Sequence, residues 1–201
     1  VLYSITPKEL MNTGKILMPR MHFVEPDKDY IDDKNEIKNE IACVISSVKK
    51  HSEIYTNEAR IIVFCKSASD AHDMAESNIF KEVLPDWNVN ALTSLSDRMA
   101  KNNKTRKKIF QEFSESKKSI LFHYDIVSEG VDLPGATAII PLRIMNNIKI
   151  IQAIGRVLRL NHNDKENFIN EKICLEDKNK WIKPYGYIIL PIIGYDFAIA
   201  S

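Results

Sequence analysis

Features that would assign this chain to a class by composition alone are scarce or missing. Only 3 of its 201 residues are cysteine. These lie far apart with no histidine at metal-ligand spacing, which argues against structural zinc and for a reducing, cytoplasmic setting. The net charge of +1 excludes a polycationic protein, so any contact with nucleic acid has to be local. No apolar run is long enough to span a bilayer and no signal-peptide pattern opens the chain, so we expect no membrane partner.

The usual phosphate-binding and nucleophile motifs are missing as well. The chain has neither a Gly-x-x-x-x-Gly-Lys-[Ser/Thr] loop nor a Gly-x-Gly-x-x-Gly turn. No serine or cysteine lies in a nucleophile elbow. His123 lies within an apolar run, which favours a core position over a catalytic one. With 44% apolar residues the chain can bury a full core, and its start at Val1 suggests a piece of a longer protein.

Apolar runs and helical periodicities alternate along the chain. This alternation predicts an α/β fold with a mostly parallel sheet covered by helices on both faces. Residues 161–183 are polar and predicted to form loop with some helix. The expected strands are 20–24, 60–65, 88–92, 119–124, 136–141 and 185–192, and the expected helices lie within 1–18, 33–50, 71–79, 96–113 and 147–160.

Polar residues follow three of these strands. Ser67 comes after the second strand, Thr93 and Ser94 after the third, and the segment 124–134 after the fourth. In parallel sheets, ligands bind at the carboxyl ends of the strands. We therefore expect one functional rim. Lysines and arginines of the helix at 96–113 are most simply a solvated basic face.

The helix at 147–160 carries the most informative pattern. Gln152, Arg156 and Arg159 share one polar stripe, and two guanidinium groups on one face suit phosphate oxygens. Gly155 costs roughly 1 kcal/mol in a helix, so close approach of a ligand or backbone is a reason for it. A solvated helix with surface arginines is the alternative. The residues predicted to be buried are Ile150, Ile151, Ile154, Val157 and Leu158.

Three motifs, in order, resemble those of superfamily-two helicases. Cys65-Lys-Ser67 resembles motif IV, Tyr124-Asp-Ile-Val-Ser-Glu-Gly-Val-Asp-Leu-Pro134 resembles motif V, and Gln152-Ala-Ile-Gly-Arg-Val-Leu-Arg159 resembles motif VI. The resemblance implies a RecA-like three-layer domain over residues 16–201, with residues 1–15 as a linker or the end of a preceding lobe. The Ser-Glu-Gly-Val-Asp-Leu-Pro form is more similar to motors of restriction enzymes than to DEAD-box RNA helicases.

The resemblance implies a role for each motif residue. Arg159 would be the arginine finger that reaches the γ-phosphate of ATP, with Arg156 beside it. Gln152, Gly130 and Asp132 would contact the nucleotide, which the missing N-terminal RecA-like lobe would hold with Mg²⁺. The residues that would border the nucleic-acid backbone are Lys66, Ser67, Thr93, Ser94, Tyr124 and Asp125.

The implied function is the C-terminal motor lobe of an ATP-dependent helicase or translocase that acts on DNA rather than RNA. By itself the fragment should be inactive, because it lacks the phosphate loop. Tyr124 departs from the family pattern, in which a threonine commonly contacts the nucleic acid, so that contact is open. The alternative function is a RecA-like platform that binds nucleic acid or protein without a motor.

Overall fold

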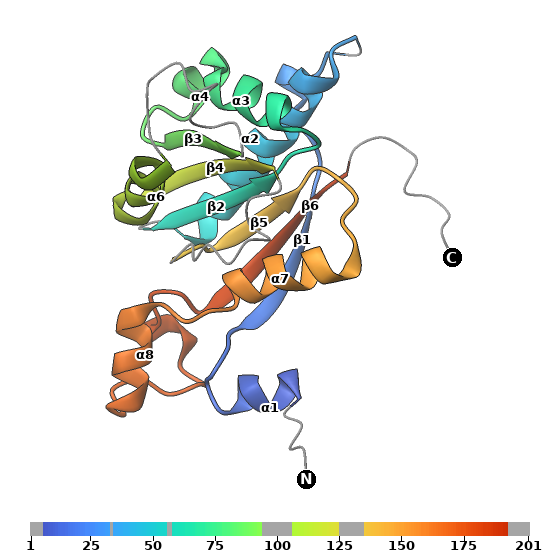
Figure 1. Ribbon diagram of the computed structural model, residues 1–201. Coiled ribbons are helices and arrows are strands. Elements are labelled where there is room, and N and C mark those ends of the chain that lie inside the picture. The colour runs from blue at the N-terminus through green and yellow to red at the C-terminus, as the bar shows by residue number, and fades with distance from the viewer. Residues whose placement is uncertain (1–5, 33, 56–57, 94–105, 125–134, 193–201) are drawn as a thin grey trace.

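A single sheet of six parallel strands forms the centre of the protein (Figure 1). The strand order β1-β6-β5-β2-β4-β3 confirms the α/β prediction. The computed structural model describes residues 6–32, 34–55, 58–93, 106–124 and 135–192. The strands are β1 (Met18–Val24), β2 (Ala59–Phe64), β3 (Asn88–Thr93), β4 (Lys118–Tyr124), β5 (Ala138–Pro141) and β6 (Tyr185–Pro191).

Most of the described helices lie close to their predicted positions, but the helix predicted over 147–160 ends at Val157, and the helix Asn78–Val83 was not predicted. Thr6 caps the first of them through a capping box with Glu9, as Thr-Pro in this position predicts. The polar segment 161–183 contains one α-helix and one 3₁₀ helix. The helices are α1 (Pro7–Asn12), η1 (Lys28–Tyr30), α2 (Glu36–Ile54), α3 (Ala68–Glu76), α4 (Asn78–Val83), α6 (Arg106–Glu115), α7 (Asn147–Val157), α8 (His162–Ile169) and η3 (Lys178–Lys180).

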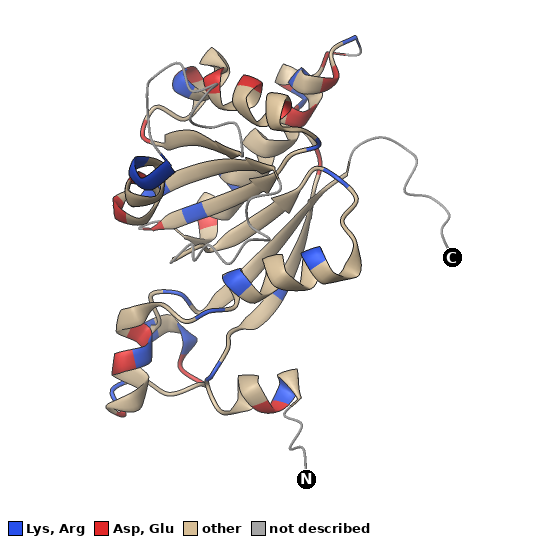
Figure 2. Ribbon diagram, viewed as in Figure 1, with Lys and Arg blue, Asp and Glu red and all other residues tan. Residues whose placement is uncertain are grey.

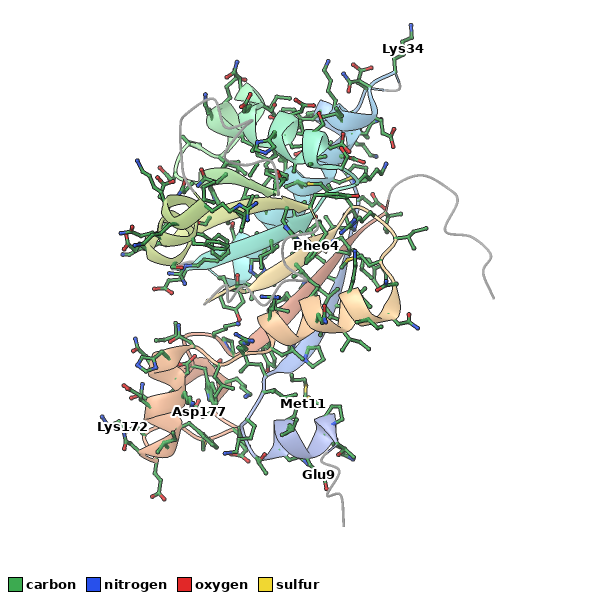
Figure 3. All side chains as sticks on the ribbon, in the orientation of Figure 1. Glu9, Met11, Lys34, Phe64, Lys172 and Asp177 are labelled. Atoms are coloured by element: carbon green, nitrogen blue, oxygen red, sulfur yellow. The ribbon has the colours of Figure 1, made fainter. Side chains whose placement is uncertain are left out.

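Alternate residues of each central strand enter two separate cores. Ile61 and Val63 of β2 pack with α2, α3 and α4, whereas Ile62 and Phe64 pack with α6 and α7. Both sets are fully or almost fully buried, which explains why β2 is an uninterrupted apolar run. Figure 3 shows Phe64 near the middle of the molecule.

One predicted core residue is on the surface instead. Val157 and Leu158 are buried as expected and Ile150 and Ile154 are half-buried, but Ile151 is 67% exposed. Ile148, which was not predicted to be buried, is 70% exposed. Ala153 takes the place against the sheet. At 100° per residue, Ile151 lies well away from the helix face that contains Ala153 and Val157, so the buried face is narrower than the sequence pattern predicted.

A buried histidine network joins α2 to the start of the sheet. The Thr137 hydroxyl donates to the Arg60 carbonyl and accepts the Arg60 N–H, each at 3.0 Å. His51 Nε2 lies 2.8 Å from the same hydroxyl oxygen and therefore carries the proton. Burial, with smaller contributions from His22 and Lys183, lowers the pKa of His51 to about 3.

We expect this histidine to make the fold less stable in acid. Its pKa is about 3 in the folded state against an ordinary 6.5, so between these values only the unfolded chain binds the proton. Stability is unaffected by His51 above pH 6.5 and falls as the pH drops toward 3, by about 1.4 kcal/mol per pH unit. Urea unfolding between pH 7 and 4 measures the slope. His51→Gln keeps an N–H donor and should show a flatter slope; equal slopes would contradict the assignment.

Candidate functional site

The carboxyl ends of β2, β3 and β4 bring together the residues of the predicted nucleic-acid track. Thr93 pairs in register with Tyr124 across β3 and β4. The Cys65 N–H donates to the His123 carbonyl at 2.9 Å, which places Lys66 and Ser67 at the same edge. The prediction that these residues share one edge of the sheet is therefore confirmed for the described residues.

The positive charge of Lys66 is offset by two carboxylates of α2. Its Nζ contacts Glu36 and lies 2.8 Å from Glu40 Oε1. Hydrogen bonds to these two groups raise the pKa of Lys66, while burial raises the pKa of Glu40, which is only 3% exposed. The local charge around Lys66 is thus not positive.

The two hydroxyls at this edge already have partners. Ser67 caps α3, and its Oγ accepts the Asp70 N–H at 3.1 Å. Thr93 is fully buried, and its Oγ1 lies 3.1 Å from Nε2 of the buried His72. Ser67 is half-buried and can present its hydroxyl to a ligand, whereas the Thr93 side chain faces the protein interior.

Tyr124 has a cationic neighbour that the motifs did not indicate. The Arg143 guanidinium carbon lies 4.7 Å from the centre of the Tyr124 ring, and both residues are half-buried. Arg143 follows β5, so the rule that identified the other strand ends would have found it. His123, next to Tyr124, is a core residue as predicted. It is 1% exposed, and its Nδ1 lies 3.3 Å from the Leu92 carbonyl.

Helix α7 carries Gln152 and Arg156, whereas Arg159 lies two residues past its end at Val157, so the predicted stripe extends beyond the helix. Gln152 and Arg159 are exposed, and Arg156 is half-buried. The helix contains basic residues and no acidic residue, in contrast to α2 and α3 (Figure 2). Among the described residues, no heavy atom outside the helix lies within 4 Å of a Cβ placed on Gly155. Packing within this part of the chain therefore does not explain the glycine, and the space beside it is open.

The described strand-end residues share one edge, but the arginines do not lie there, so the expectation that one rim holds the whole site is wrong. Helix α7 begins after the carboxyl end of β5 and runs back along the sheet, so that its last turn lies over the start of β6 (Figure 1). A Cβ on Gly186, the second residue of β6, would be 2.4 Å from the Val157 carbonyl oxygen. Arg159 consequently lies near the opposite end of the strands from Ser67. The arginines and the track residues form two separate regions.

Some predicted residues fall outside the described part of the chain. Within that part, no three His, Cys, Asp or Glu side chains are grouped as a metal site, and no helix has the length and hydropathy of a membrane span. The predicted residues outside it are Ser94, Asp125, Gly130 and Asp132.

Comparisons with known proteins agree with this architecture. Residues 41–161 match the family described as Helicase conserved C-terminal domain. The chain is 27% identical over 135 residues to "Putative helicase 22" of Sulfolobus islandicus filamentous virus, covering 67% of this chain and 22% of that protein.

Two solved structures share the fold. One is domain 2 of the DEAD-box helicase Mss116p bound to an RNA duplex, with a TM-score of 0.52, 16% identity, and coverage of 88% of this chain and 65% of that one. The other is the ATP-dependent Type ISP restriction-modification enzyme LlaBIII bound to DNA, with a TM-score of 0.54, 18% identity, and coverage of 93% and 13%. The family match spans more than half of the sequence, and the fold is that of the neighbouring RecA-like lobes. The chain belongs to the helicase conserved C-terminal domain family.

Proposed function

We propose that this domain is the C-terminal motor lobe of an ATP-dependent DNA helicase or translocase. The observation that carries the proposal is the motif at the end of α7: Gln152 and Arg159 are exposed, Arg156 is half-buried, and the described residues leave the space beside Gly155 unfilled. A glycine that costs helix stability and meets no other element among the described residues is consistent with a surface that a ligand or another domain approaches.

In this proposal Arg159 is the arginine finger and Arg156 its neighbour. A permanently charged planar group stabilises the charge that spreads over the oxygens of the transferring phosphoryl group. ATP and Mg²⁺ are held mainly by the N-terminal RecA-like lobe of the whole protein. Gln152, with Gly130 and Asp132, contributes the nucleotide contacts of this lobe.

The exposed isoleucines of α7 support a partner lobe on the same face. Ile148, Ile151 and Gly155 recur at helical spacing and border Gln152 and Arg159. Two large apolar side chains exposed next to a polar stripe are typical of a surface that another domain covers. We assign that surface to the N-terminal lobe, and residues 1–15 to the connection with it. Helix α1 in this segment contributes no buried residue.

The nucleic-acid track runs along the carboxyl ends of β2, β3 and β4. Ser67 at the start of α3, together with Ser94, Tyr124 and Asp125, borders the phosphates without reading bases. Thr93, whose side chain is buried, and Lys66, whose charge is offset by Glu36 and Glu40, line this track only through their backbone. Tyr124 stacks with Arg143 and offers a cationic, aromatic surface.

DNA is the proposed substrate because the motif V sequence resembles restriction-type motors, and LlaBIII, which shares the fold, is bound to DNA. ATPase stimulation of the whole protein by DNA and by RNA tests this choice. The proposed location is the cytoplasm.

We expect this 201-residue chain by itself to hydrolyse no ATP. It supplies arginines, whereas the phosphate loop that cradles ATP is missing from its sequence. Release of phosphate is measured with saturating single-stranded DNA, and the whole protein serves as the positive control. Nucleic-acid-stimulated turnover by the chain alone would contradict the proposal that ATP is held mainly by the N-terminal lobe. If the whole protein also lacks turnover but binds DNA, the non-motor platform is the correct function.

A further inference from the structure

The turn that follows α7, formed by Leu158 and Arg159, is held by contacts to two other segments. The Leu17 N–H, just before β1, donates to the Leu158 carbonyl at 2.8 Å. Lys183 Nζ donates to the Arg159 carbonyl at 2.9 Å. These are carbonyls of the helix end, which have no partner within the helix itself. Both contacts come from far along the chain, so this helix end is fixed by tertiary structure.

Lys183 is itself fixed in place by α8. Asp164 of α8 is fully buried, and its two carboxylate oxygens accept the N–H groups of Ile182 and Lys183, each at 2.8 Å. Lys183 is only 2% exposed. A continuous path of hydrogen bonds therefore runs from Asp164 through the backbone of Lys183 and its ammonium group to Arg159.

A buried ammonium group is costly to maintain. Burial lowers the pKa of Lys183 to about 7, with Arg60 and Arg159 acting in the same direction and Asp164 opposing them. A methionine in this position would fill similar space without the desolvation cost. The contact that distinguishes lysine from an apolar residue here is the hydrogen bond from its ammonium group to the Arg159 carbonyl.

We propose that Lys183, held by Asp164, is a positioning residue that sets where the Arg159 side chain extends from the turn that follows α7. This inference rests on the proposed role of Arg159 as the arginine finger. Misplacing a catalytic group by about 1 Å costs roughly 100-fold in rate, so a backbone anchor at the finger residue matters for turnover. Lys183 does not touch the nucleotide in this proposal; it acts through Arg159.

The test uses the whole protein with Lys183→Met and Lys183→Gln, which have the same side-chain length but differ in the N–H donor. Lys183→Met should lower kcat between about 10- and 100-fold with KM for ATP within about two-fold, because the finger acts on the transition state. Lys183→Gln should recover part of the loss. Lys180→Met, at an exposed lysine paired with Asp177, is the control and should retain full kcat.

Rates are normalised to the folded fraction, so that a stability loss is not read as a catalytic loss. Equal kcat in the folded Met variant and the wild type would overturn the positioning role. Adding Lys183→Met to Arg159→Ala should lower the residual rate no further, and an additional loss would also overturn it. If Arg159→Ala alone leaves kcat unchanged, the arginine-finger assignment fails instead, and the two failures are distinguished.

Discussion

Replacing Arg159 with alanine in the whole protein is expected to reduce ATP turnover by about 10³-fold or more, the range found for arginine fingers. The side chain is exposed at the end of α7, so its removal leaves no buried cavity. Folding and DNA binding should therefore persist, because the proposed track lies at the opposite ends of the strands. Steady-state ATPase and DNA affinity, measured on the same preparation, check both parts.

Lys149→Ala is the matched control for this variant. Lys149 belongs to the first turn of the same helix, where Asn146 accepts its backbone N–H, so the change removes a cation from α7 at its other end. Turnover should stay within about two-fold of the wild type, because no transition-state contact is lost. A comparable loss in both variants would indicate a general effect of charge on α7 and would remove the specific role of Arg159.

A methyl group added at Gly186 is expected to destabilise the domain by about 1–3 kcal/mol. The new Cβ would be 2.4 Å from the Val157 carbonyl oxygen and 2.8 Å from the Leu158 side chain. A backbone atom cannot rotate away, so α7 has to shift off β6. The same shift displaces Arg159, and turnover of the whole protein should fall even though Gly186 touches no substrate. Urea unfolding of Gly186→Ala measures the stability loss.

Gly155→Ala provides the opposite case on the same helix. Its added methyl group meets no atom outside the helix among the described residues, and alanine favours a helix over glycine by roughly 1 kcal/mol. We expect this variant to be more stable than the wild type, and Gly186→Ala to be less stable. Equal stabilities for the two variants would contradict the packing that places α7 on β6.

Sequence patterns were sufficient for most of the architecture. The run Arg60–Cys65 predicted a strand buried on both faces, and β2 is such a strand. Spacing also identified α7 and the part of its polar stripe formed by Gln152 and Arg156, because helical periodicity is a local property of the chain. Arg159 lies past the helix end. The order of the three motifs indicated the family, which the match over residues 41–161 shows.

Other features depend on contacts between distant segments. The direction of α7 across the sheet separates Arg159 from Ser67, and the sequence predicted a single rim instead. Ile151 has the hydropathy of a core residue, yet the sheet contacts only the narrower face centred on Ala153 and Val157.

The sequence by itself determined the parallel α/β class, the positions of the strands and the identity of the motif residues, since all of these follow from local periodicity and residue type. The tertiary structure decided which residues support the finger. Lys183 and Gly186 contact the end of α7 and the turn after it only because β6 and the residues before it pack against this helix. Nothing in the polar segment before β6 distinguishes Lys183 from a solvated lysine, because burial arises from neighbours that are remote in sequence.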